Sequence, residues 1–275
     1  MQQIAEQLLN LAARMAERQV SPEARSAVYD CDICRDVGSV AVLAGEVLSW
    51  SDPRLVGELF EARTCDCVKK RYRERLFRSS NITEEFKSAG FKGFRVEDRP
   101  ACIREARDVA LDYYQRFEDV KAGPHNSCTL VGPPGSGKTR LLMAVANGLM
   151  RKGYSVLYFP WAESIGELRK DFEGLQDRLN LMKTVDVLFL DDLYKGREMP
   201  TEFTAEALFA VVNFRYSNRK PMLVSSERDF DALFRVDEGI ARRIYERSKD
   251  FRVVMGLTKE EAEAGMELNY SLVAM

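Results

Sequence analysis

The sequence lacks several features that would place it in other classes of protein. It has no excess of charge: its formal net charge is −2, so any contact with DNA must come from a local patch and not from a general cationic field. No apolar run approaches the roughly 18 residues that a membrane span needs. Glu6, Asn10 and Arg14 interrupt the apolar residues at the N-terminus, which argues against a signal peptide. We therefore expect a cytoplasmic protein with no membrane partner. The single histidine, His125, is assigned no role.

The composition is that of a soluble globular protein, with 45% hydrophobic and 31% charged residues. A length of 275 residues allows one domain of ordinary size and a smaller one. Near the N-terminus, Ile4, Leu8, Leu11 and Met15 recur at helical spacing and predict an amphipathic helix. This helix either packs on its own small domain or docks on a partner, and both readings stay open.

Four of the six cysteines form two close pairs, Cys31-x-x-Cys34 and Cys65-x-Cys67. Thiols stay reduced in the cytoplasm, so ligands or buried thiols are favoured over disulfides. Two such pairs can meet in a tetrahedral Zn²⁺ site whose positions are all filled by protein, and such a closed site is structural. The alternatives are redox-active or buried thiols. The remaining two cysteines fall in helical and strand patterns and are predicted core residues.

A change in composition near residue 80 predicts two domains. Alternating apolar residues at 40–50, interrupted by a glycine, suggest a short hairpin, and a basic run follows at 69–78. The basic run either neutralises DNA phosphates or forms a solvated connecting helix. We predict an N-terminal zinc-binding domain over 1–80, a linker over 81–100 and a second domain over 101–275.

Strand and helix patterns alternate throughout the second domain. Apolar strands are predicted at 128–131, 155–159, 185–190 and 222–225, with helices at 103–117, from 138, at 204–217, and ending near 246. Such alternation is typical of an α/β fold in which a parallel sheet lies between helices.

A glycine-rich segment lies between the strand at 128–131 and the helix from 138. Gly132-Pro133-Pro134-Gly135-Ser136-Gly137-Lys138-Thr139 fits the P-loop pattern G-x-x-x-x-G-K-[ST] in its required strand–turn–helix context. Its backbone N–H groups and the helix N-terminus favour phosphate oxygens. Lys138 is expected to contact the β- and γ-phosphates of ATP, and the Thr139 hydroxyl to ligate Mg²⁺.

A pair of carboxylates ends the buried strand at 185–190. Asp191 and Asp192 are expected at the same sheet edge as the P-loop, because ligands bind at the carboxyl ends of parallel strands. Asp191 is the candidate Mg²⁺ ligand, and Asp192 is the candidate for orienting the attacking water. The alternative is a strand-end pair that caps the next turn.

Taken together, these motifs resemble those of a known family. The segments that carry the resemblance are Cys31 to Gly38, Cys65 to Cys67, the P-loop, Leu190-Asp191-Asp192-Leu193-Tyr194-Lys195-Gly196, Lys220 to Glu227 and Asp237 to Glu246. In this order, over about residues 28–272, they are similar to DnaC/DnaI-type replicative helicase loaders, which are AAA+ ATPases. Loaders of phages and mobile elements of Gram-positive bacteria are the most similar.

The resemblance implies a function and a set of catalytic residues. It implies an ATP-dependent loader that binds a DnaB-family hexameric helicase through its N-terminal domain and places it on single-stranded DNA. Arg243 matches the arginine finger that reaches the ATP of a neighbouring subunit, so self-association through the ATP site is expected; the alternatives are an ion pair on a surface helix, or Arg242 in that role. Ser226 or Glu227 falls at the sensor-1 position. Because most AAA+ proteins have Glu where this chain has Asp192, we expect slow, switch-like hydrolysis.

Two more structural expectations follow from the resemblance. Only 32 residues follow Arg243, too few for a full C-terminal lid, so weak nucleotide binding is expected until another subunit or the helicase completes the site. A DNA-binding insertion is implied at about 161–181, with basic Arg169, Lys170 and Arg178 and with Phe159 and Trp161 at its edge; Phe159 also fits a strand core.

Three other functions were weighed against the loader. A transposition helper ATPase of the IstB type shares the C-terminal fold but as a rule lacks a four-cysteine module. A small-metabolite kinase would need a substrate lid and an acceptor pocket. In a third possibility the protein is an adaptor whose hydrolysis is vestigial. Phe91 and Phe94 are candidate walls of an adenine site.

Overall fold

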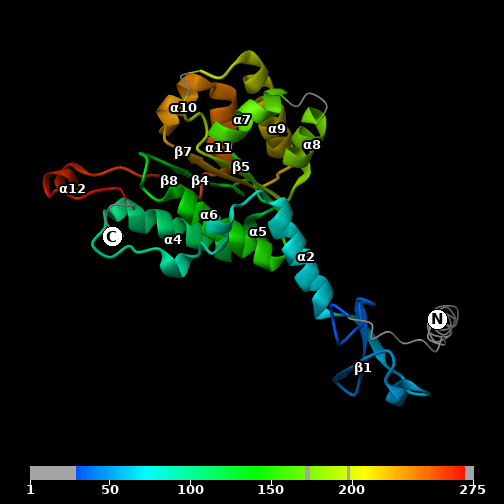
Figure 1. Ribbon diagram of the computed structural model, residues 1–275. Helices are drawn as coiled ribbons and strands as arrows, with labels where there is room; N and C mark the ends of the chain where they lie inside the picture. The colour runs from blue at the N-terminus through cyan, green and yellow to red at the C-terminus, as the bar shows by residue number, and fades with distance from the viewer. Residues whose placement is uncertain (1–28, 171–173, 197–198, 270–275) are drawn as a thin grey trace. The chain divides into compact units, whose positions relative to one another are not determined.

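The computed structural model describes residues 29–170, 174–196 and 199–269 (Figure 1). The helix predicted at residues 4–15 lies outside this range. Contacts within the chain define two compact units, one ending at Lys69 and the other starting at Lys70. This division falls inside helix α2 (Asp66–Ser79), ahead of the boundary expected at residue 80. The domain limits given above stay predictions, and each unit is described by itself.

The first unit contains a small antiparallel sheet. Strands β1 (Ser39–Leu43), β2 (Glu46–Leu48) and β3 (Glu61–Thr64) follow the order β2-β1-β3, with the 3₁₀ turn η1 at Pro53–Leu55. The expected hairpin is confirmed: Leu43 pairs with Glu46 across a two-residue turn. Both turn residues, Ala44 and Gly45, have positive φ, as such tight hairpin turns require. Strand β3, fully exposed and without an apolar alternation, was not predicted.

The second unit is built on a five-stranded parallel sheet of order β5-β6-β7-β4-β8. Its strands are β4 (Cys128–Val131), β5 (Val156–Pro160), β6 (Val187–Asp191), β7 (Met222–Ser226) and β8 (Arg252–Val254). The first four were predicted from their apolar runs. All strands run the same way, so their carboxyl ends meet at one edge of the sheet. That edge carries the candidate site.

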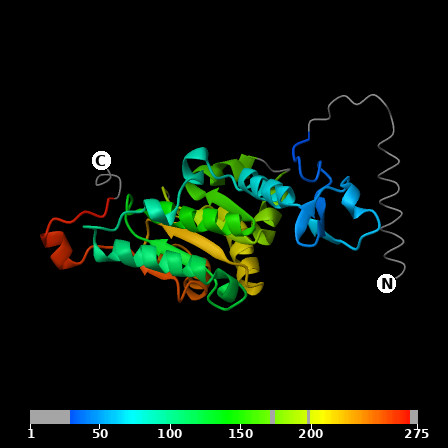
Figure 2. The same cartoon turned by 90° about the horizontal axis from the view of Figure 1, so that it is seen from below.

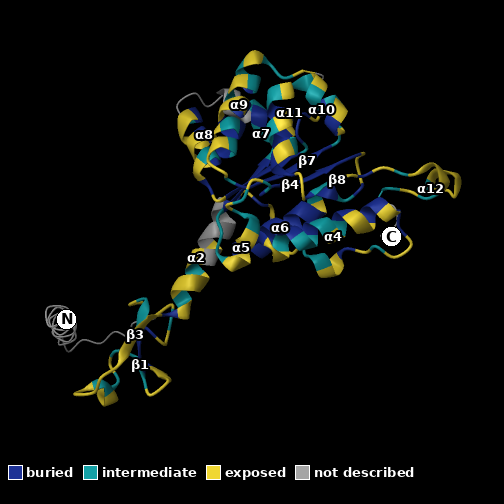
Figure 3. Ribbon diagram, turned by 180° about the vertical axis from the view of Figure 1, so that it is seen from behind, coloured by how far each residue is buried: buried dark blue, intermediate teal, exposed yellow. Residues whose placement is uncertain are grey.

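Helices cover both faces of this sheet. Alternate strand residues pack on α4 (Ala101–Gln115) and α6 (Lys138–Lys152), and Figure 2 shows this layer in front of the strands. The opposite set packs on α7 (Trp161–Lys170), α8 (Leu175–Thr184), α9 (Glu202–Ser217) and α11 (Glu238–Arg247). The strands and the inner helix faces are accordingly buried (Figure 3). The shorter elements are α3 (Glu84–Lys87), η2 (Phe91–Gly93), α5 (Phe117–Val120), α10 (Phe230–Val236) and α12 (Lys259–Glu263).

The predicted DNA-contacting segment is helical, but its aromatic residues are not available for stacking. Phe159 and Trp161 are only 6% and 2% exposed and belong to the core between the sheet and α7. The expectation that they stack on single-stranded DNA is therefore wrong, and the strand-core reading of Phe159 is confirmed. Arg178 lies exposed on α8, whereas the side chains of Arg169 and Lys170 lie outside the described part of the chain. Within the described ranges, no helix is long and apolar enough to cross a membrane.

Candidate functional site

The phosphate loop leaves β4 and enters α6 at the carboxyl edge of the sheet, as predicted. Its first residue, Gly132, has φ of 145°, and a Cβ atom there would lie 2.3 Å from the Met255 carbonyl oxygen. Gly137, which caps α6, has φ of 92°. Only glycine fits the close approach at Gly132, and glycine is strongly favoured at both backbone conformations. The spacing of glycines seen in the sequence therefore has a direct steric cause.

Lys138 is drawn into the loop instead of extending into solvent. Its side chain is largely buried, and Nζ donates hydrogen bonds to the Pro133 carbonyl oxygen (2.8 Å) and the Ser136 hydroxyl (3.2 Å). Burial lowers the pKa of Lys138, and the nearby carboxylates oppose this change. A cation is thus held at the centre of the curled backbone, where it could contact phosphate oxygens.

Asp191 lies at the end of β6 and accepts hydrogen bonds from three hydroxyl groups. Thr139 donates to Oδ1 at 2.9 Å, Ser225 donates to the same oxygen at 2.5 Å, and Tyr158 donates to Oδ2 at 2.9 Å. Burial raises the pKa of the Asp191 carboxyl, and the three donors oppose that rise. The pairing of Thr139 with Asp191 brings together two oxygen ligands of the kind that Mg²⁺ prefers. Thr139 and Asp191 were predicted together; Ser225 and Tyr158 were not.

Asp192 takes part in an ion-pair network. Its backbone has φ of 50°, and its carboxylate lies 2.8 Å from Nζ of Lys195, which also pairs with Glu227 at 2.8 Å. These two carboxylates raise the pKa of Lys195. Glu227 and Asp192 thus share one cation beside the phosphate loop.

The two serines that end β7 face different partners. Ser225 donates to Asp191 and accepts a hydrogen bond from the Asp192 amide at 2.8 Å. Ser226, the residue selected from the sequence, donates to the Leu193 carbonyl oxygen at 2.9 Å and accepts from the Arg228 amide at 3.1 Å. The serine beside the carboxylate is therefore Ser225, and the role assigned to Ser226 stays a prediction. Adjacent side chains of a strand point to opposite faces of the sheet, so the strand pattern already predicts that Ser225 and Ser226 have different partners.

The two candidate finger arginines on α11 differ in their surroundings. Arg243 donates to the Asn213 side chain at 3.0 Å and to the Gly239 carbonyl oxygen at 2.8 Å, and its guanidinium lies 4.8 Å from the centre of the Phe209 ring. Arg242 is exposed and pairs with Glu238 of the same helix at 3.2 Å. Arg243 is thus held in a defined position on the α9–α11 surface, whereas Arg242 is a surface ion pair.

The four predicted cysteine ligands converge in the first unit. Their sulfur atoms all lie within 4.8 Å of one another, with Cys31 and Cys65 3.8 Å apart and Cys34 and Cys67 3.3 Å apart. Four sulfurs bound to zinc at about 2.3 Å form a tetrahedron with edges of about 3.8 Å. The cluster also forms much of this unit's small core, together with Val40. The geometry fits a structural zinc ion.

The thiols in this cluster differ in acidity. Burial raises the pKa of Cys34, but hydrogen bonds from the Gly38 amide and the neighbouring thiols outweigh it, so that the pKa falls to about 7. Burial and the neighbouring sulfurs raise the pKa of Cys67 to about 12.

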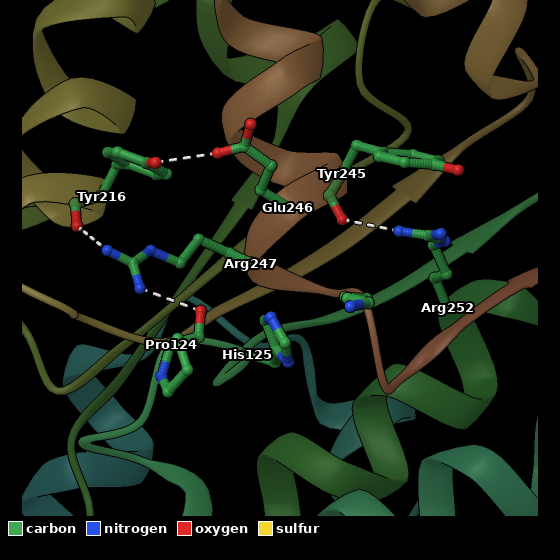
Figure 4. Close-up of a pocket in the computed structure, with 8 residues that line it drawn as sticks. Pro124, His125, Tyr216, Tyr245, Glu246, Arg247 and Arg252 are labelled. Atoms are coloured by element: carbon green, nitrogen blue, oxygen red, sulfur yellow. Dashed lines mark hydrogen bonds between the residues drawn. The ribbon is translucent and has the colours of Figure 1, made fainter.

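A hollow of about 400 Å³ lies at the opposite, amino edge of the sheet (Figure 4). Arginine and tyrosine side chains line it, but the arginines are engaged by backbone carbonyls: Arg247 donates to Pro124 and Tyr216, and Arg252 to Tyr245. His125 pairs with Asp250 nearby at 2.9 Å. These groups hold loops together, and the hollow is not part of the candidate site.

Comparison with known proteins agrees with this geometry. Residues 122–250 match the family model described as IstB-like ATP binding protein. The phage-like element PBSX protein XkdC of Bacillus subtilis (strain 168) is 39% identical over 254 residues, covering 91% of this chain and 89% of that protein. The replicative helicase loader DnaI of the same strain is 30% identical over 202 residues, covering 68% and 62%.

Solved structures show the same fold. The crystal structure of DnaI superposes with a TM-score of 0.52 at 24% identity, covering 64% of this chain and 95% of that one. The DnaC helicase loader superposes with a TM-score of 0.53 at 21% identity, covering 63% and 100%. Fold and site together define an α/β P-loop protein with an ATP-binding domain over residues 122–250. The chain belongs to the same family as XkdC, and it is similar to the helicase loader DnaI over part of its length.

The contact between Gly132 and Met255 generates a first prediction. Gly132→Ala places a Cβ against a carbonyl oxygen at a φ that alanine rarely adopts, so we expect a loss of about 1–3 kcal/mol in the free energy of unfolding. Gly166→Ala is the matched control, because its Cβ would meet no atom within 4 Å and alanine favours the helix. Urea unfolding followed by circular dichroism measures both. Equal stability of the two variants would contradict the steric argument.

Proposed function

We propose that this protein is an ATP-switched loader that binds a DnaB-family hexameric replicative helicase and places it on single-stranded DNA. The observation that carries the proposal is the combination, in one chain, of an AAA+ ATP site with a separate four-cysteine unit. Its relatives named as replicative helicase loaders support the same function.

The phosphate loop, residues 132–139, binds the triphosphate of ATP in this proposal. Backbone N–H groups and the N-terminus of α6 face the phosphates, and Lys138 supplies a full positive charge. Thr139 and Asp191 would hold Mg²⁺, which neutralises the charge that develops on the phosphates. Their 2.9 Å hydrogen bond and the buried carboxylate support this assignment.

Hydrolysis is assigned to three further residues. Asp192 orients the attacking water, Ser226 acts as a sensor of the phosphate, and Arg243 of one subunit stabilises the ATP of its neighbour. Asp192 is one methylene shorter than Glu and is engaged by Lys195, which supports slow hydrolysis suited to a switch. Asn213 and Gly239 hold Arg243 in a defined position on the α9–α11 surface, which supports a role for it toward a neighbouring subunit. Self-association therefore accompanies activity.

The cysteine unit serves as the helicase-docking module. A structural Zn²⁺ ion is held by the four thiolates of Cys31, Cys34, Cys65 and Cys67. Because the core of this unit is built largely around the cluster, the unit needs the bound ion to fold. A transposition helper of the IstB type is the second candidate, since the IstB-like model matches residues 122–250. That model does not reach the cysteine unit, and this favours the loader.

Lys138→Ala should strongly weaken the binding of ATP. Removing the charge at the centre of the loop is expected to weaken binding of a fluorescent ATP analogue by roughly a hundredfold or more. The control, Lys249→Ala, removes an exposed lysine beside the hollow at the opposite sheet edge and should bind like the wild type. Equal affinity of both variants would show that the loop does not hold the nucleotide.

Cys31→Ser should release the zinc. We expect about one zinc ion per chain in the purified wild type after dialysis and clearly less in the variant, because three thiolates hold zinc less tightly than four. Cys102→Ala, which changes a buried cysteine of α4 outside the cluster, should keep the metal. Elemental analysis by mass spectrometry measures the content. A metal-free wild type that is folded would refute the assignment.

Binding to a helicase tests the proposed function itself. The full-length protein should co-purify with the DnaB-type hexamer of its host at micromolar concentrations. Cys31→Ser should lose this binding, whereas Lys138→Ala should retain docking yet fail to deliver the helicase to single-stranded DNA in a loading assay. No association of the wild type with the hexamer, with or without ATP, would rule the loader out.

A further inference from the structure

The chain after β8 folds back across the phosphate loop. We call residues Gly256–Asn269 the C-terminal strap. It leaves the sheet beside Gly132, where the Met255 amide donates to the Val131 carbonyl oxygen at 2.7 Å. It then passes through α12 and returns to the carboxyl edge of the sheet; Figure 1 shows α12, in red, beyond the end of α4. The ATP site was expected to be half open, but the C-terminal strap covers it on the side of Gly132.

Specific contacts anchor the strap at both ends of its path. Thr258 and Glu261 form a capping box at α12, and Oε1 of Glu261 accepts a hydrogen bond from the Ala101 amide at 2.7 Å. Arg99, only 5% exposed, donates to the carbonyl oxygens of Leu268 (2.8 Å) and Asn269 (3.2 Å). Because the buried guanidinium of Arg99 binds two backbone oxygens at once, it fixes the position of the end of the strap.

The anchor places one polar side chain on the phosphate loop. The side-chain amide of Asn269 lies against Gly135, in the middle of the loop: a Cβ atom at Gly135 would be 2.6 Å from Oδ1 and 3.2 Å from Nδ2 of Asn269. Gly135 has φ of 76°, so the loop presents bare backbone to this amide. An amide can donate to a phosphate or ribose oxygen and carries no charge to repel it.

We propose that the C-terminal strap is a nucleotide-binding element, in which Arg99 positions Asn269 to contact the bound nucleotide at the phosphate loop. This inference rests on the proposed ATP site and adds residues to it. Since Asn269 lies against Gly135 of the phosphate loop, it contacts a part of the site that ATP and ADP share, and both nucleotides depend on it alike.

Isosteric and truncating variants of Asn269 in the full-length protein test the proposal. Asn269→Ala is expected to weaken binding of fluorescent ATP and ADP analogues about tenfold each, the range for one hydrogen bond to a charged group. Asn269→Asp keeps the shape and adds a negative charge, so its loss should be larger and should shrink as salt is raised. Ala264→Asp adds the same charge at an exposed position of the strap and should bind normally.

The possible outcomes distinguish a failure of the proposed strap from a failure of the proposed ATP site. Wild-type affinity in both Asn269 variants would overturn the role of the strap and leave the ATP site standing. Tighter binding by Asn269→Ala would also overturn it, because the strap would then block the site. If the wild type itself binds no nucleotide, the proposed function fails first. Thermal melts without nucleotide should be the same for Asn269→Ala and the wild type, since a loss of fold would lower them.

Arg99→Lys provides a second, independent measurement. Lysine keeps the charge but cannot span two carbonyl oxygens in a fixed fork, so the strap should loosen. Trypsin cleavage after the exposed Lys259 reports this: added ATP should protect the site in the wild type and protect it several-fold less in Arg99→Lys. Protection by ATP that is equal in the two proteins, or absent from a wild type that binds ATP, would count against a closing strap.

Discussion

The carboxylate of Asp191 is the junction on which the site depends. It joins β6 to α6 through Thr139, to β7 through Ser225 and to β5 through Tyr158. A buried carboxylate is costly unless donors surround it, and here three hydroxyls from three elements do so. The same hydrogen bonds that make this charge tolerable also fix the distance between the phosphate loop and the neighbouring strand ends. Structural support and the proposed chemistry therefore share the same atoms.

Much of this arrangement was accessible from the sequence, because its signals are local. The phosphate loop requires glycines at set positions, and Gly132 and Gly137 have the backbone angles that demand them. Apolar runs bounded by turns predicted four of the five strands of the sheet, since strands buried on both faces read as continuous hydrophobic segments. The cysteine pairs were predicted to meet, and their sulfurs do lie together. Each of these inferences starts from a pattern of residues close together in the chain.

What the sequence did not reveal depends on contacts between distant residues. Strand β8 is three residues long and gains its identity from pairing with β4. Ser225 and Tyr158 become important only because the sheet order brings their strands beside β6. Phe159 and Trp161 are of the residue type that stacks on bases, but both are buried in the core and cannot reach DNA. The contact of Asn269 with Gly135 spans more than a hundred residues, which no local pattern encodes.

The hydroxyl of Ser225 contacts both neighbouring aspartates through two separate hydrogen bonds. It donates its hydrogen to Asp191, and its oxygen receives the Asp192 amide. A hydroxyl has one hydrogen to donate and lone pairs to accept with, so the direction of the Asp191 bond also sets where Ser225 Oγ can accept from the Asp192 amide. A rotation of the Asp191 carboxylate therefore reorients the Ser225 hydroxyl and changes its hydrogen bond with the Asp192 amide. That peptide belongs to a residue with φ of 50°, where the backbone has little room to yield. The strand end thus behaves as a coupled unit, in which the Asp191 carboxylate and the Asp192 peptide depend on the same hydroxyl group.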